Sequence, residues 1–235
     1  MKLRFPSALQ NARATFSLPY GHLGRPTGGT EEVAQAWVDV SGILPDGKHA
    51  GWAVLNDGKY SYDVQGTEIG MTAARSPVYA WHDPHKLSPE GQYEYLDQGY
   101  QEFTYALVPH EGDWAAAGVA RRAAELNERP LAFFEHFHPG TLPPARGFVD
   151  DKAGPVMVCV VKRAEDGGAT VVRAYETSGA PHQARFELGF ARRRVEAAFG
   201  PGEVKTFLVP DDSHLPVREV SLLEWPLDGA AGRPN

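Results

Sequence analysis

The chain has 235 residues, of which 42% are hydrophobic, 11% aromatic and 23% charged, a composition typical of folded globular proteins and not of disordered ones. This length is sufficient for one large β domain or two smaller ones, each with its own core. The formal net charge of −7 argues against nucleic acid and anionic membranes as partners, because both attract clustered positive charge.

The N-terminus, Met1–Pro6, lacks the apolar core of a signal peptide.

The first predicted feature is a β-hairpin. Residues 51–55 are apolar, and residues 60–64 alternate tyrosine and valine with polar side chains. Asn56-Asp57-Gly58 stands between these runs and tolerates positive φ. The pattern therefore predicts that residues 51–64 form a hairpin of two paired strands.

Further strands and one helix follow along the chain. A turn at Gln65-Gly66 leads into an expected strand at 68–72, and residues 103–107 alternate as a strand with one buried face does. A helix is predicted from Asp113, which can cap free N–H groups, to about Asn127. We expect this helix to pack on the side of a sheet.

The proline-rich stretch 139–144 cannot continue a central strand, so a domain boundary is expected near it. The fold class predicted is mainly β: a large antiparallel β-sandwich over residues 1–148, a small β-sandwich over 149–227 and a disordered tail at 228–235. The second part contains strand-like runs at 156–161, 170–176, 185–190, 193–199, 204–209 and 217–225.

The run 156–161 contains the single cysteine of the chain, Cys159. One cysteine allows no disulfide within the chain, and this usage favours a cytoplasmic location. No stretch reaches the ~20 apolar residues of a membrane span, so no membrane partner is expected.

Catalytic motifs are absent from the sequence: it contains no G-x-S-x-G elbow, P-loop or H-E-x-x-H. The best metal candidates are His136 and His138, which would share a face if they lay on a strand, with His82 and His85 as further ligands. Several aspartates are predicted to cap local backbone instead of acting on a substrate; they are Asp39, Asp63, Asp83, Asp97 and Asp113.

Aromatic side chains gather in the loop 76–101, which also contains proline and glycine. They are Trp81, Tyr93, Tyr95 and Tyr100. Aromatic rings of this kind stack on sugars or cover a domain interface, and the sequence leaves both uses open.

Three segments carry a family resemblance. The first is FSLPYGHLGRPT at 16–27, followed by EEVAQAWVDVS at 31–41. The second is GWAVLNDGKYSYDV at 51–64, and the third joins ARSP at 74–77 to DQGYQEFTYALVPH at 97–110. Together they resemble, in the same order, the C-terminal, non-catalytic region of glycoside hydrolase family 38 α-mannosidases, and they cover roughly residues 5–130.

The resemblance implies a retaining α-mannosidase that removes terminal mannose, with a catalytic aspartate, an acid and a divalent metal, usually zinc. Family members carry these groups in a preceding catalytic domain. The chain itself is expected to hold no catalytic residue and no cofactor, and to have its own catalytic domain and mannose-containing glycans as partners. An alternative is a carbohydrate-binding module that contacts glycans through the aromatic loop 79–100.

The resemblance also implies that part of this region reaches the rim of the active site. Arg75, Asp97 and Gln98 are the candidates, with Trp81 and Tyr100 beside them. The chain departs from the family at Tyr100-Gln101 and in a longer insertion at 78–96. The family's large, supersandwich-like domain has strands before Met1, so we expect a truncated sandwich that self-associates through an exposed sheet edge.

Overall fold

The structure is a computed structural model that describes residues 1–78, 88, 90–141, 143–152 and 154–227. Over these residues the strands form four antiparallel sheets, accompanied by one short helix. The predicted mainly β fold with a side helix is confirmed. In the described residues, the helix is too short and too polar to cross a membrane.

The chain divides into two compact units. The first comprises Met1–Leu18 and Leu23–Arg129, and the second comprises Pro19–His22 and Pro130–Asn235. The division expected from the sequence, after residue 148, stays a prediction about domains. The predicted tail at 228–235 lies outside the described residues.

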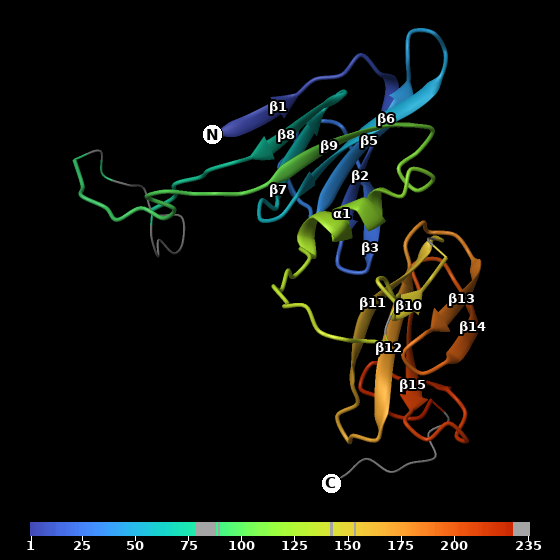
Figure 1. Cartoon of the computed structure of the whole chain (residues 1–235). Helices are drawn as coiled ribbons and strands as arrows, with labels where there is room; N and C mark the ends of the chain where they lie inside the picture. Colours follow the sequence, from blue (N-terminus) through green and yellow to red (C-terminus); the bar gives the residue numbers. More distant parts are fainter. Residues whose placement is uncertain (79–87, 89, 142, 153, 228–235) are drawn as a thin grey trace. The chain divides into compact units, whose positions relative to one another are not determined.

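The first unit is a β-sandwich of two sheets (Figure 1). The five-stranded sheet has the order β3-β2-β5-β6-β9, and the four-stranded sheet has the order β1-β8-β7-β4. The strands are β1 (Lys2–Phe5), β2 (Gln10–Leu18), β3 (Gly21–Arg25), β4 (Glu32–Val33), β5 (Trp37–Ile43), β6 (His49–Asn56), β7 (Ser61–Gln65), β8 (Glu68–Thr72) and β9 (Tyr105–Glu111).

The core of this sandwich follows from alternation along the strands. Val38 and Val40 of β5 point to one face of the five-stranded sheet, where they are fully buried. Tyr62, Ile69 and Met71 of the four-stranded sheet belong to the same core cluster. Each such side chain contributes roughly 1.5–3 kcal/mol by leaving water, so the cluster holds the two sheets together.

The opposite face of the five-stranded sheet is covered by α1 (Val119–Asn127). The rings of Trp37 and Trp114 lie 4.9 Å apart beneath it. The helix begins later than predicted: Asp113 accepts a hydrogen bond from the N–H of Ala116 at 2.8 Å and so caps a separate turn. Gly118, the N-cap residue, has a left-handed backbone with φ of 65°, so the preceding turn does not continue into the helix.

The hairpin predicted for residues 51–64 is wrong. β6 pairs with β5 and β9, whereas β7 pairs with β4 and β8, so the two strands belong to different sheets. The side-chain oxygen of Asn56 accepts hydrogen bonds from Gly58 N (3.0 Å) and Lys59 N (2.7 Å). The turn residues thus form a corner that passes the chain from one sheet to the other. The next turn, at Gln65, does join a hairpin, β7–β8.

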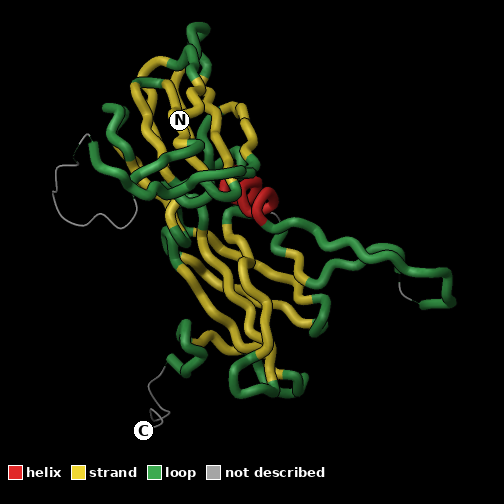
Figure 2. Tube along the Cα trace, turned by 90° about the vertical axis from the view of Figure 1, so that its left-hand side faces the viewer, coloured by secondary structure: helices red, strands yellow, loops and turns green. Residues whose placement is uncertain are grey.

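The second unit is a smaller β-sandwich, whose strands are drawn in yellow in Figure 2. Its sheets have the strand orders β10-β13-β14 and β11-β12-β15-β16. Phe186, Phe199 and Phe207 come from both sheets, and their ring centroids lie 6.3–6.5 Å apart. The predicted strand runs are confirmed, although β13 begins and ends earlier than the predicted run 185–190 and the last strand is shorter than expected. The strands are β10 (Val149–Asp150), β11 (Val156–Arg163), β12 (Ala169–Glu176), β13 (His182–Leu188), β14 (Arg193–Phe199), β15 (Val204–Pro210) and β16 (Arg218–Val220).

Candidate functional site

Two extended segments, residues 73–78 and 95–104, leave the sheets of the first unit on the same side (Figure 1). Val78 and Tyr95 form an antiparallel bridge, and Leu96 N donates to Pro77 O at 2.9 Å. We call this pair of segments the rim arm, since it contains the residues predicted to approach an active site.

The rim arm brings Gln98 into contact with Ser76, the residue that follows Arg75 in the chain. Ser76 donates its hydroxyl to Leu96 O at 3.0 Å, and the amide of Gln98 donates to Ser76 Oγ and to Leu96 O, the latter at 3.2 Å. The side chain of Arg75 is exposed. The arm therefore holds Gln98 in place by its own hydrogen bonds and leaves the guanidinium of Arg75 in solvent.

Asp97 and Tyr100 lie in the second segment of the rim arm, residues 95–104. Asp97 has a left-handed backbone with φ of 55°, and its carbonyl accepts the amide of Gln101 at 3.0 Å. Tyr100 is 89% exposed and donates its hydroxyl to Glu102 at 3.0 Å. Its ring is available to a partner. Trp81, the remaining rim candidate, lies outside the described residues, as do His82, Asp83 and His85.

Asp39 of β5 and His110 of β9 form a buried polar pair on one face of the five-stranded sheet. For Asp39 the sequence predicted only capping of local backbone. The carboxylate of Asp39 is fully buried; its Oδ2 lies 2.7 Å from His110 Nε2, and its Oδ1 accepts the Ser41 hydroxyl at 2.7 Å. Burial lowers the pKa of a histidine, but the bond and the charge of Asp39 outweigh it and raise the pKa of His110 above its ordinary value. The pair links β5 to β9.

This pair requires a glycine on the strand between β5 and β9. A Cβ added at Gly51 of β6 would lie 2.6 Å from His110 Cε1 and 2.7 Å from Ser41 Oγ. The imidazole therefore occupies the space that a side chain would take. Asp39, Ser41, Gly51 and His110 all fall within the segments that carry the resemblance.

Asp63 also differs from the prediction, because its side chain pairs with cations instead of capping backbone. Its carboxylate, 4% exposed, contacts Lys2 Nζ and lies 2.6 Å from Arg4 Nη1. This contact ties β1 to β7 across β8, and so it stabilises the four-stranded sheet.

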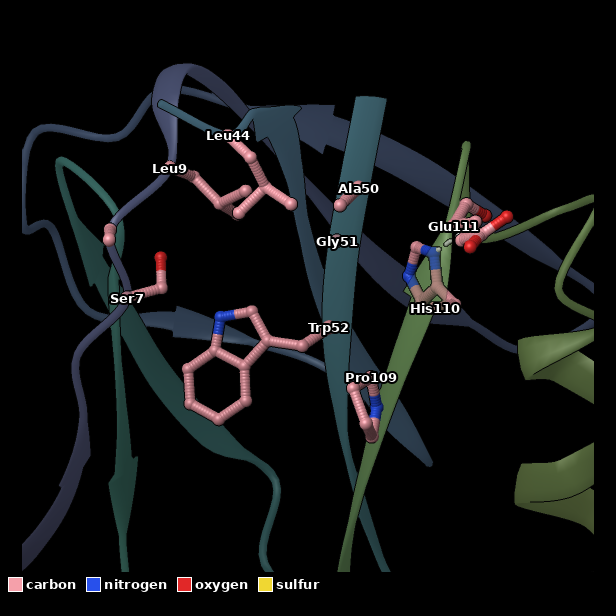
Figure 3. A pocket seen from close by; sticks show the side chains of 10 residues that line it. Ser7, Leu9, Leu44, Ala50, Gly51, Trp52, Pro109, His110 and Glu111 are labelled. Carbon is pink, nitrogen blue, oxygen red and sulfur yellow. Dashed lines mark hydrogen bonds between the residues drawn. The ribbon is translucent and has the colours of Figure 1, made fainter. Parts of the chain in front are cut away.

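A cavity of about 520 Å³ opens in the first unit. Figure 3 shows the indole of Trp52 between Ser7 on one side and Pro109 on the other. The indole Nε1 is buried and has no hydrogen-bond partner among the described residues. The lining is mainly apolar, as is usual in small-molecule sites. Sequence reasoning missed this cavity because its walls come from separate segments of the chain.

Glu176 organises two turns of the second unit. Its buried carboxylate accepts the N–H groups of Ser178 (2.6 Å), Gly179 (2.8 Å) and Gly202 (2.9 Å). Burial raises the pKa of a carboxyl group, but these hydrogen bonds outweigh it and hold the pKa of Glu176 below its usual range. Ser178 Oγ lies 3.0 Å from His182 Nε2 but donates its proton to Glu176, so the histidine is not placed as a general base.

The alternative metal ligands, His136 and His138, do not lie on a strand, so the shared face assumed for them is absent. His138 Nδ1 lies 3.1 Å from Pro139 O, and His138 Nε2 lies 3.8 Å from Glu135 Oε1. In the part of the chain that the structure describes, no three histidine, cysteine or acidic side chains gather as a metal would require. Among the described residues, His136 and His138 are thus not joined by a third zinc ligand.

Comparisons with known proteins agree with one another. Residues 1–85 match the family model "Glycosyl hydrolases family 38 C-terminal domain". Human "Alpha-mannosidase 2C1" is 32% identical over 192 residues, which are 76% of this chain and 16% of the human protein. "Alpha-mannosidase G" of Dictyostelium discoideum is 31% identical over 180 residues, 71% of this chain and 14% of that protein. The chain thus spans a small part of these relatives.

A solved structure supports the fold. The crystal structure of a protein in glycosyl hydrolase family 38 from Enterococcus faecalis superposes with a TM-score of 0.70 at 19% sequence identity. The superposed region covers 88% of this chain and 26% of the Enterococcus faecalis chain.

Proposed function

Because this chain is homologous to the C-terminal part of glycosyl hydrolase family 38 α-mannosidases and carries that family's C-terminal domain, we propose that it is an accessory, structural region of such an enzyme. In this role it supports a separate catalytic domain that removes terminal α-mannose with the help of a divalent metal. The chain alone has no glycosidase activity.

The observation that carries this proposal is that polar residues in the segments of family resemblance are buried and bonded within the sandwich. Asp39, Asn56 and Tyr62 are all buried, and their side chains bond to neighbouring strands and turns. A catalytic carboxylate has to reach a sugar; these side chains instead stabilise the sandwich. The segments that define the resemblance are therefore suited to a scaffold.

The test is an assay of the purified chain on an aryl α-mannoside, with and without added zinc. We expect no turnover above the blank in either condition. The control is the same assay on an intact family 38 α-mannosidase, which should hydrolyse the substrate. Zinc-dependent turnover by the chain alone would overturn the proposal.

The rim arm suggests how this scaffold meets its catalytic domain. Arg75 and Tyr100 are exposed there, while Gln98 is held by hydrogen bonds within the arm. We propose that the arm borders the active site of the assembled enzyme, with Arg75, Asp97 and Gln98 at its rim. In an enzyme that contains this region, Arg75→Ala should then raise KM more than it lowers kcat; an unchanged KM would contradict this placement.

The exposed ring of Tyr100 supports a second candidate function, a carbohydrate-binding module that stacks glycans on the loop 79–100. Titration with mannose and mannobiose, followed by tryptophan fluorescence, separates the two roles. A saturable signal that Tyr100→Ala abolishes would favour the binding module, with Trp81→Phe identifying the reporting indole. No signal at high sugar concentration would leave the scaffold as the better description.

A further inference from the structure

The segment after α1 exposes an unusual concentration of large apolar side chains. Leu131, Phe133, Phe134 and Phe137 have between 84% and 111% of their reference areas accessible to solvent. Residues 130–141 form no helix or strand and run as an extended loop (Figure 2). We call these four side chains and the backbone between them the phenylalanine segment.

The area of the phenylalanine segment reaches the upper end of what a monomer ordinarily exposes in one patch. Phenylalanine side chains bury roughly 150–250 Å² each, so the three phenylalanines offer on the order of 450–750 Å², and Leu131 adds to this area. The largest apolar patch of a typical monomer is roughly 300–600 Å². Each partner of a standard protein–protein interface contributes about 800 Å². The segment therefore supplies most of the area that one side of a stable interface needs.

The segment carries little charge. Glu135 is the one acidic residue between 130 and 138, and its carboxylate lies 3.8 Å from His138 Nε2. The ring of His136 meets the ring of Phe134 edge-on, at 6.1 Å and 82°. A surface of this kind can face an identical copy of itself with little like-charge repulsion, as an isologous interface requires.

Two of the sheet edges, β9 and β11, are poor competitors for self-association. In β9, an edge strand, Pro109 removes one N–H from the free side of the ladder. In β11, the edge of the second unit, the register shifts between Val158 and Val160, which forms a bulge at Cys159. Prolines and bulges are devices by which natural sheets prevent edge-to-edge pairing.

We propose that the phenylalanine segment is a self-association surface, and that its partner is the same segment of a second copy of this chain. The proposal does not depend on the proposed scaffold role, because it concerns only the contact between copies. It names a different surface from the sheet edge through which the sequence led us to expect association.

Sedimentation velocity of the full chain between about 1 and 200 µM tests this proposal. We expect a concentration-dependent dimer. The triple variant Phe133→Ser, Phe134→Ser, Phe137→Ser should weaken dimerisation at least tenfold while keeping the circular dichroism spectrum, because the replaced rings are exposed. The matched control is Leu222→Ser with Leu223→Ser, which removes two exposed leucines from another part of the second unit and should leave the dimer unchanged.

Several results would overturn the proposal. A wild-type chain that stays monomeric to about 200 µM would show that a different partner, such as another part of a longer α-mannosidase chain, covers the segment. Equal association of the triple variant and the wild type would place the contact elsewhere. Loss of the dimer in the leucine control alone would assign the contact to Leu222 and Leu223.

Discussion

Replacing Asp39 by asparagine tests whether the buried pair with His110 holds β5 and β9 in position. The substitution preserves the size of the side chain but removes its charge. In the wild type the carboxylate accepts two hydrogen bonds, one from Ser41 Oγ and one from His110 Nε2, each 2.7 Å long. An amide offers one acceptor oxygen, so at least one of the two bonds is lost or reversed.

The expected loss in the free energy of unfolding is about 1.5–3 kcal/mol, the range for a hydrogen bond to a charged group. With a urea dependence of about 2 kcal/mol per M, the unfolding midpoint should fall by about 1 M. Tryptophan fluorescence is a suitable signal, because Trp225 is the one tryptophan of the sequence outside residues 1–129, so the signal reports mainly on the first unit.

The loss should depend on pH in one direction. The folded-state pKa of His110 is raised above 6.5, so the stabilisation from its protonated form is fully present below about pH 6.5. It is lost as the pH rises through the folded-state pKa. The difference in stability between the wild type and Asp39→Asn should therefore be larger near pH 6 than near pH 9.

The control is Asp46→Asn, which removes an exposed carboxylate that lies 3.0 Å from Lys48 Nζ. Exposed pairs of this kind contribute little to stability, so the midpoint should hardly change. Equal, small shifts for both variants, with no dependence on pH, would refute the role assigned to the buried pair.

Three further substitutions test neighbouring features by urea unfolding or circular dichroism. Gly51→Ala places a Cβ 2.6 Å from His110 Cε1 and should cost about 1–3 kcal/mol, whereas Gly58→Ala, with no atom within 4 Å, should be neutral; equal effects would contradict the steric argument. Asn56→Ala removes the acceptor of two corner N–H groups and should cost about 1–3 kcal/mol; an unchanged midpoint would exclude this capping role. Glu176→Gln should destabilise the second unit at neutral pH. Because the folded-state pKa of Glu176 is lowered, its stabilisation is present above about pH 4.5 and lost as pH falls through the folded-state pKa, so the gap should close in acid; a constant gap would count against it.

Local patterns were sufficient for the strands but not for their partners. The alternation at 193–199 predicted β14 with its observed bounds, because side-chain burial along a strand has a period of two. The apolar run at 51–55 and the alternation at 60–64 fit a hairpin and a sheet-to-sheet corner equally well. What decides between them is the burial of both Val54 and Tyr62 in one core, each from its own sheet, and that is a property of the whole sandwich.

Contacts distant in sequence escaped prediction for the same reason. Asp39 and His110 are 71 positions apart, and neither carries a local signal of the other. The cavity beside Trp52 likewise joins residues 7–9 to residues 109–111. The rim candidates were located by resemblance alone, and the contact of Gln98 with Ser76 follows from a fold that the spacing in the sequence does not specify.

The corner at Asn56 also explains how the rim arm is held at its base. Asp57 Oδ1 accepts the N–H of Thr104 at 2.7 Å, and Lys59 Nζ donates to Gln101 Oε1 at 2.8 Å. These contacts lie where the arm ends and β9 begins. In a hairpin turn at this position, the same residues would join two strands of one sheet. Because the turn changes sheets instead, its polar side chains are free to fix the direction of the arm. Substitutions at Asp57 or Lys59 should therefore alter the arm without touching its exposed residues.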